Sequence, residues 1–165
     1  MERFVSNTSL TREHEVATKF GVAVFILDDK NRIFTTKELE NKSSTGKVAG
    51  EYSVICETQE PNEDWLENLQ RGLEEELGIP RAMFPKVFDL SELIVWESGF
   101  VDGVWATVIK INCKDSDLLI RLIGTLGRPD KMEILGWKTK EEFKGLQLRR
   151  GVGNILAKFE DEIFS

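Results

Sequence analysis

Apolar residues gather in a few short runs along this chain, and each run predicts one element of structure. Val16 to Leu27 reads VATKFGVAVFIL, and its β-branched and aromatic residues predict a central strand. Residues 28–31 are two aspartates, a lysine and an asparagine, which is typical of a turn. Arg32 to Thr36 then predicts the returning strand of a hairpin.

Further apolar runs predict the remaining strands of a sheet. They are Tyr52–Cys56, Val87–Glu97, Val104–Asn112 and Leu118–Ile123. The second and third of these are joined through residues 98–103, SGFVDG, which predict a hairpin with a long or bulged loop.

Three segments carry helical patterns instead. Between residues 57 and 79, a turn-rich acidic segment leads into an apolar stripe that faces the core, formed by Leu66, Leu69, Leu73 and Leu77. Gly78 and Pro80 end this helix. Thr139 and Glu142 form a capping box that starts a short helix, and Arg149–Phe164 predicts a last helix that covers the sheet.

Polar segments between these elements predict loops. Residues 37–50 form one such loop, and its Lys42 and Lys47 are able to reach a phosphate, although loop lysines are usually solvated. Arg81–Pro85 is a second break with the predicted exposed pair Met83 and Phe84, and residues 124–131 are a Gly- and Pro-containing surface loop.

Length and charge narrow the possible functions. A chain of 165 residues fits one domain that buries roughly 70% of its unfolded surface, so we expect an N-terminal arm over residues 1–15 and one domain over 16–165. The net charge of −7 disfavours binding to a nucleic-acid backbone. It still permits a nucleotide whose phosphates are bound through Mg²⁺.

The cysteines and the apolar runs indicate the cellular compartment of the protein. Cys56 and Cys113 are too few and too far apart for a zinc site, and we expect both to be reduced thiols. The first residues lack a cationic and apolar leader, and no apolar run is long enough to cross a membrane. These features predict a cytoplasmic protein without a membrane partner.

Several side chains have both a structural and a functional interpretation. Glu75 and Glu76 lie at the edge of the apolar stripe, where carboxylates either bind a divalent cation or form a solvated face, with Arg71 as an ordinary helical ion-pair partner. Trp96 and Trp105 are candidates for stacking against a base, but aromatic residues in strands more often belong to the core. His14, the one histidine, lies among charges and is interpreted as solvated.

The segment from Glu57 to Ile79 resembles the Nudix box, Gly-x5-Glu-x7-Arg-Glu-U-x-Glu-Glu-x-Gly-U, in which U is bulky and aliphatic. Seven of the nine fixed positions agree without a gap. They are Glu63, Arg71, Leu73, Glu75, Glu76, Gly78 and Ile79. The resemblance implies an α/β fold, a Nudix-like α/β/α sandwich around a mixed β-sheet, covering roughly residues 17–143, and many relatives are dimers.

Two fixed positions of the box differ. Glu57 stands at the opening Gly, and Gly72 replaces the Glu that follows Arg71. In the family that Glu commonly helps to hold the metal. A Gly inside a helix costs about 1 kcal/mol relative to Ala, so Gly72 either admits a close neighbour or reflects relaxed selection for catalysis. Glu60 is a carboxylate that could replace the missing ligand.

The resemblance implies hydrolysis of a nucleoside-diphosphate-linked pyrophosphate with Mg²⁺ or Mn²⁺. Glu75 and Glu76 would bind the metal, Arg71 and Glu63 would brace the loop against the helix, and Glu133 or Asp130 would be the general base. Met132–Lys138 resembles the family's late strand, with Glu133 and Trp137 in the places of an acidic residue and a Trp. The alternative is a Nudix-like domain that binds a nucleotide or regulates without turnover, and a third is a chance match in an unrelated α/β domain.

Overall fold

The computed structural model describes residues 19–101, 104–126 and 132–165. The elements run in the order β1 (Phe20–Leu27), β2 (Ile33–Glu38), η1 (Ser43–Thr45), β3 (Tyr52–Ser53), β4 (Ile55–Thr58), α2 (Trp65–Leu77), η2 (Arg81–Met83), α3 (Phe84–Val87), β5 (Phe88–Val101), β6 (Val104–Cys113), α4 (Ser116–Leu126), β7 (Met132–Lys138), α5 (Lys140–Lys144) and α6 (Arg150–Ile163).

The strands form one mixed sheet in the order β3-β2-β1-β6-β5. β1 runs parallel to β6, whereas β1 with β2, β2 with β3, and β5 with β6 pair antiparallel. Two further strands pair beside this path, β4 antiparallel to β1 and β7 antiparallel to β2. The predicted hairpin of β1 and β2 and that of β5 and β6 are both confirmed.

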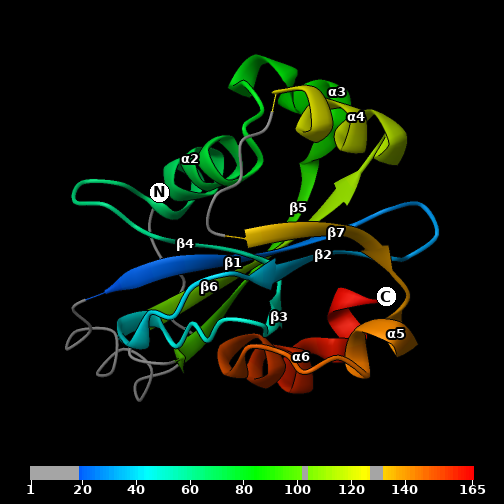
Figure 1. Cartoon of the computed structure of the whole chain (residues 1–165). Helices are drawn as coiled ribbons and strands as arrows, with labels where there is room; N and C mark the ends of the chain where they lie inside the picture. The colour runs from blue at the N-terminus through cyan, green and yellow to red at the C-terminus, as the bar shows by residue number, and fades with distance from the viewer. Residues whose placement is uncertain (1–18, 102–103, 127–131) are drawn as a thin grey trace.

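Strand β1 is apolar along its whole length because both faces of the sheet are covered. Its side chains alternate, with Val22, Val24 and Ile26 packing into one core and Ala23, Phe25 and Leu27 packing into the other. Helices α2, α3 and α4 cover the first face, and α5 and α6 cover the second (Figure 1). The predicted α/β/α sandwich is therefore confirmed.

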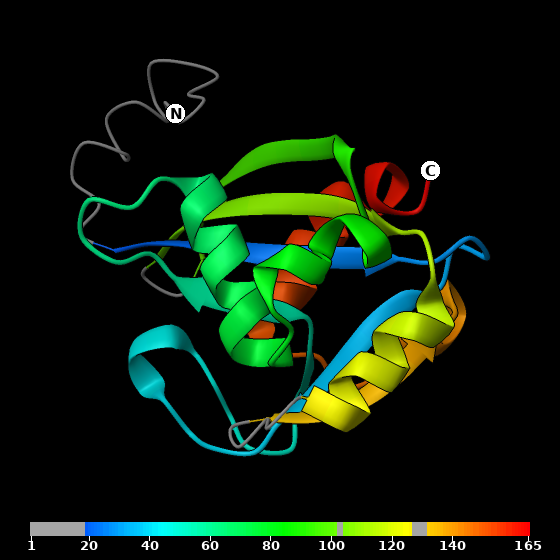
Figure 2. The ribbon, with the colours of Figure 1, turned by 90° about the horizontal axis from the view of Figure 1, so that it is seen from above.

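Helix α2 is the predicted acidic helix, and it crosses the sheet over β1 and β4 (Figure 2). Leu69, Leu73 and Leu77 are buried as expected. The side chain of Asp64 caps the N-terminus by accepting a hydrogen bond from the Glu67 backbone at 2.8 Å. Gly78 ends the helix in the left-handed conformation, with φ of 72°. The predicted capping box of Thr139 and Glu142 also starts α5.

The strand predicted over Leu118–Ile123 is wrong, because these residues lie within helix α4. The carboxylate of Asp115 accepts the Leu118 backbone N–H at 3.0 Å, which satisfies a donor of the first helical turn. Leu119 and Ile123, four residues apart, are buried against the sheet. An apolar run of this length fits either element, and here the helical spacing determines which side chains reach the core.

Other boundaries differ locally from the prediction. The segment Tyr52–Cys56 is divided between two strands, since β3 pairs with β2 and β4 pairs with β1. Phe84, predicted to be exposed, is buried within the short helix α3, and Met83 packs partly against the same core. Residues 124–126 continue α4, while the rest of the predicted loop over 124–131, the N-terminal arm and His14 lie outside the described residues.

Candidate functional site

A pocket opens between α2 and the start of α6. Its floor is formed by the sheet, from Gly21–Ala23 of β1, Cys56–Thr58 of β4 and the beginning of β6. One wall is the last turns of α2, and the opposite wall comes from the loop after β2 and from the first turn of α6. The pocket thus joins segments that are far apart in the sequence.

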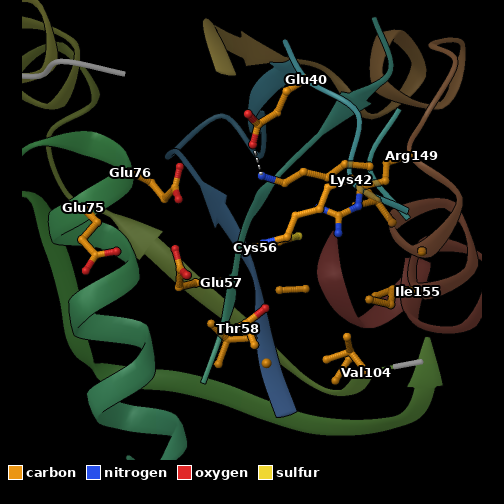
Figure 3. Close-up of a pocket in the computed structure, with 17 residues that line it drawn as sticks. Glu40, Lys42, Cys56, Glu57, Thr58, Glu75, Glu76, Val104, Arg149 and Ile155 are labelled. Atoms are coloured by element: carbon orange, nitrogen blue, oxygen red, sulfur yellow. Dashed lines mark ion pairs between the residues drawn. The ribbon is translucent and has the colours of Figure 1, made fainter. Parts of the chain in front are cut away.

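The wall formed by α2 and β4 is acidic. Glu57, Glu75 and Glu76 line it, and Figure 3 shows their carboxylates on the same side of the pocket. Glu75 is exposed, whereas Glu57 and Glu76 are half-buried. Carboxylate oxygens are the hard ligands that Mg²⁺ and Mn²⁺ prefer.

Arg71 organises these acidic groups, and its own side chain is only 14% exposed. Its Nε donates to Glu63 Oε2 at 2.7 Å, and its Nη2 donates to Glu63 Oε1 at 2.9 Å and to the Thr58 carbonyl at 2.7 Å. Glu63 also accepts the Glu60 backbone N–H at 3.0 Å. The predicted contact of Arg71 with Glu63 is therefore present, and it fixes the loop before α2 against the helix.

The remaining nitrogen of Arg71, Nη1, is shared by three weaker partners. It lies 3.2 Å from Glu75 Oε2, 3.5 Å from Glu57 Oε1 and 3.7 Å from Glu60 Oε1. The ordinary helical ion pair of Arg71 with Glu75 is thus present, but it is one of several. These longer distances leave the carboxylates able to turn toward another cation.

The close Arg71 guanidinium holds the pKa of Glu63 below its usual value of 4.5. The same hydrogen bonds raise the pKa of Arg71. Both groups therefore stay charged throughout the neutral range, and the brace between the loop and α2 persists there.

The opposite wall of the pocket carries cationic side chains from Lys42, Lys47 and Arg149. Arg149 Nη1 lies 3.5 Å from Glu38 Oε1, and Lys47 Nζ lies 3.8 Å from Glu38 Oε2. Figure 3 shows Lys42 and Arg149 across the pocket from the acidic wall. Glu40 lines the same wall, and Lys47 Nζ lies 3.9 Å from Glu40 Oε1. The phosphate-reaching interpretation of Lys42 and Lys47 remains a prediction.

Neither candidate tryptophan forms a stacking surface for a base in this pocket. Trp105 is fully buried, and its indole N–H donates to Glu97. Trp96 stacks on Phe159 of α6, with ring centroids 5.4 Å apart and an angle of 23° between the ring planes. The core interpretation is confirmed for Trp105, whereas Trp96 is half-buried and packs against the core beneath α6.

The two departures from the box lie next to each other. Gly72 is buried, and a Cβ atom built on it would lie 3.0 Å from Glu57 Cβ and 3.4 Å from Glu57 Cγ. Gly72 therefore admits a close neighbour, as one of the two sequence interpretations proposed. Glu57 itself occupies β4, where it pairs with Val22 of β1.

The structure does not bring every predicted site residue to the pocket. The Glu60 side chain is 64% exposed, and Glu60 is not among the residues that line the pocket. Glu133 is exposed on β7, opposite Lys37 of β2, and it lines a different surface hollow. Asp130 lies outside the described residues. The metal role of Glu60 and the general-base role of Glu133 remain predictions.

Two residues that line the pocket were not predicted as site residues. Arg149 precedes the final helix, and no sequence signal links it to α2. Glu57 was recognised only as a mismatch, and strand alternation with Ile55 was the signal that its side chain faces α2. Both come to the pocket through the pairing of strands.

The donor set suits a divalent cation chemically, because three carboxylates line one wall and Gly72 leaves room beside Glu57. As the side chains lie, no group of three or more His, Cys, Asp or Glu in the described part of the chain is arranged to hold an ion. Arg71 accounts for this arrangement, since its Nη1 attracts Glu57 and Glu75 to itself.

Comparisons with known proteins identify the fold. No family model and no curated protein sequence matches the chain. Among solved structures, a MutT structure from a study of the Aliivibrio salmonicida and Vibrio cholerae proteins has a TM-score of 0.55 and 17% identity, over 87% of this chain and 98% of that chain. A Nudix hydrolase from Nitrosomonas europaea has a TM-score of 0.53 and 17% identity, over 87% of each chain.

A third similar structure is the complex between the C-terminal domain of mouse MUTYH and human PCNA. It has a TM-score of 0.55 and 14% identity, over 87% of this chain and 88% of the matched chain. These likenesses show that the chain has the Nudix fold, as the resemblance of the box implied. In the described segments, no helix has both the length and the apolar character needed to cross a membrane.

Proposed function

Because the chain has the Nudix fold, we propose that it hydrolyses the pyrophosphate bond of a nucleoside-diphosphate-linked small molecule with Mg²⁺ or Mn²⁺. The observation that carries this proposal is one pocket in which Glu57, Glu75 and Glu76 line one wall, while the opposite wall carries Lys42, Lys47 and Arg149 together with Glu40. A pyrophosphate with its metal ion needs both kinds of partner in one place.

Each side chain has a defined task in this proposal. Glu75 and Glu76 hold the cation, and Arg71 acts as a positioning residue that fixes the loop and the helix through Glu63. The cationic side chains of the opposite wall orient the phosphate oxygens. A bound divalent cation would neutralise part of the phosphate charge, so that water could approach the phosphorus atom.

The reaction adds one water molecule across the P–O–P bridge. The water oxygen bonds to one phosphorus, the bond from that phosphorus to the bridging oxygen breaks, and the proton given up by water goes to the general base. Glu133 and Asp130 remain the sequence-based candidates for that base.

The test is release of nucleoside monophosphate from a panel of nucleoside-diphosphate compounds with Mg²⁺ or Mn²⁺. Glu76→Gln is expected to abolish turnover while its unfolding curve stays that of the unmodified protein. Glu74→Gln is the matched control, because Glu74 lies on the same helix but pairs with Arg81 at 3.3 Å and does not line the pocket. Equal turnover in all three proteins would contradict the assignment of Glu76.

A second candidate function is a Nudix-like domain that binds a nucleotide without hydrolysing it. The observation that favours it is Gly72, which leaves two carboxylates on the helix face where the box has three. Saturable nucleotide binding with no product under either metal would support this function. Turnover in Gly72→Glu alone would mean that the missing carboxylate accounts for the lost activity.

A further inference from the structure

The two positions at which this chain departs from the box compete for the same space. A Cβ at residue 72 would lie 3.0 Å from Glu57 Cβ, which is closer than ordinary van der Waals contact. In this chain the helix contributes no side chain at that point, and the strand contributes Glu57. The carboxylate at this contact therefore comes from β4 and not from α2.

The strand directs Glu57 toward the helix. Ile55, two residues earlier, packs into the core beneath α2, whereas Cys56 packs toward the opposite core. Because side chains alternate along a strand, Glu57 points to the same face as Ile55. Its carboxylate reaches past Gly72 into the pocket, where Glu75 and Glu76 also lie (Figure 3).

Arg71 holds the Glu57 carboxylate less closely than it holds Glu63. Its ion pair with Arg71 spans 3.5 Å, whereas Glu63 is bound to the same guanidinium at 2.7 and 2.9 Å. The Glu57 side chain is 19% exposed, so it is shielded from bulk water but not sealed in the core. Glu60 is a weaker candidate because its side chain is 64% exposed and outside the pocket.

We infer that Glu57 is the third metal-binding carboxylate of this site, and that it replaces the side chain absent from residue 72. The inference rests on the proposed function, because it assigns a further ligand to the same cation as Glu75 and Glu76. It goes beyond the box, which has a glycine and therefore no carboxylate at this position.

The first experiment measures Mn²⁺ binding in the absence of substrate, by the loss of the free-ion signal in electron paramagnetic resonance. Glu57→Gln is expected to weaken Mn²⁺ binding at least about tenfold, since even outer partners of a metal site change affinity by about 10–100-fold. Glu60→Gln and Glu74→Gln are expected to bind Mn²⁺ as the unmodified protein does. Metal-free urea unfolding of each variant confirms that it is folded.

The second experiment exchanges the two residues. Glu57→Gly removes the carboxylate and is expected to weaken Mn²⁺ binding, whereas Gly72→Glu crowds Glu57 and is expected to lower the urea midpoint. The double variant, Glu57→Gly with Gly72→Glu, is expected to recover both Mn²⁺ affinity and stability relative to the worse single variant.

The outcomes separate this inference from the proposed function. If the unmodified protein binds Mn²⁺ and Glu57→Gln binds it equally well, the inference is wrong and the proposed function stands. Weakened binding in Glu60→Gln but not in Glu57→Gln would also overturn the inference, by assigning the ligand to Glu60. If the unmodified protein binds no Mn²⁺, both the inference and the proposed function are wrong.

Discussion

Replacing Arg71 with alanine tests whether the loop before α2 is held by one buried guanidinium. The change removes two charge-assisted hydrogen bonds to Glu63 and one hydrogen bond to the Thr58 carbonyl. It also leaves the Glu63 carboxylate, 11% exposed, without its countercharge. Hydrogen bonds to charged groups contribute about 1.5–3 kcal/mol each, but the freed groups partly regain water.

We therefore expect Arg71→Ala to lower the free energy of unfolding by about 2–3 kcal/mol, less than the cost of breaking a fully buried pair. For a domain of this size, that corresponds to a fall of about 6–9 °C in Tm. Urea unfolding followed by tryptophan fluorescence measures it. Arg71→Lys keeps the charge but not the two-pronged geometry, so it should recover only part of the loss.

Arg81→Ala is the matched control. Arg81 pairs with Glu74 at 3.3 Å, but the two side chains are 48% and 41% exposed, so its loss should cost about 0–1 kcal/mol. If Arg71→Ala destabilised the protein no more than Arg81→Ala does, the role given to Arg71 as a brace would be refuted.

Three other predictions follow from particular groups. Arg71 lowers the pKa of Glu63 below 4.5, so the stability from this pair is fully present above about pH 4.5 and is lost as the pH falls through the lowered pKa. The urea midpoints measured at about pH 5.5 and about pH 3.5 should therefore differ less in Arg71→Ala than in the unmodified protein. Asp64→Ala should cost about 1 kcal/mol by removing the cap of α2, while Asp64→Asn should cost much less, and equal unfolding curves for the two variants would contradict the cap. Burial raises the pKa of the Cys113 thiol from 9.0 to about 11. At about pH 7.5, Cys113 of the folded protein should therefore react with iodoacetamide at least about 100-fold more slowly than Cys113 of the urea-unfolded protein. Mass spectrometry of the labelled peptide measures the two rates.

Sequence alone predicted the elements whose pattern is unambiguous. The apolar run that ends at Leu27 predicted a central strand, and the leucine spacing before Gly78 predicted helix α2. Thr139 and Glu142 carried their own capping signal. These elements depend mostly on neighbours within a few residues, which is why the sequence was sufficient.

The errors arose in short segments, where packing against the sheet decides which side chains are buried. Leu118–Ile123 is too short for its apolar pattern to distinguish a strand from a helix, although Asp115 before it was an available capping signal. Phe84 looked exposed beside Pro85, yet it packs edge-on against Phe88 in the core, with ring centroids 5.8 Å apart.

The candidate site, like the fold, could be predicted only in part. The brace of Arg71 and Glu63 followed from the spacing of the box, because both residues belong to one loop and helix. The cationic wall did not, since Arg149 reaches the pocket only through the pairing of Tyr52 with Leu148 beside it. A motif confined to one segment specifies one wall of a pocket, and the fold provides the other.

The contact between Glu57 and Gly72 also constrains how such a chain can evolve. A glutamate at both positions crowds the strand against the helix, and a glycine at both leaves the wall one carboxylate short. A chain with one glutamate and one glycine at these two positions can exchange them, one substitution at a time, only through one of these two intermediates. We therefore expect the two positions to vary as a unit among the descendants of one ancestor, so that a glutamate at 57 accompanies a glycine at 72.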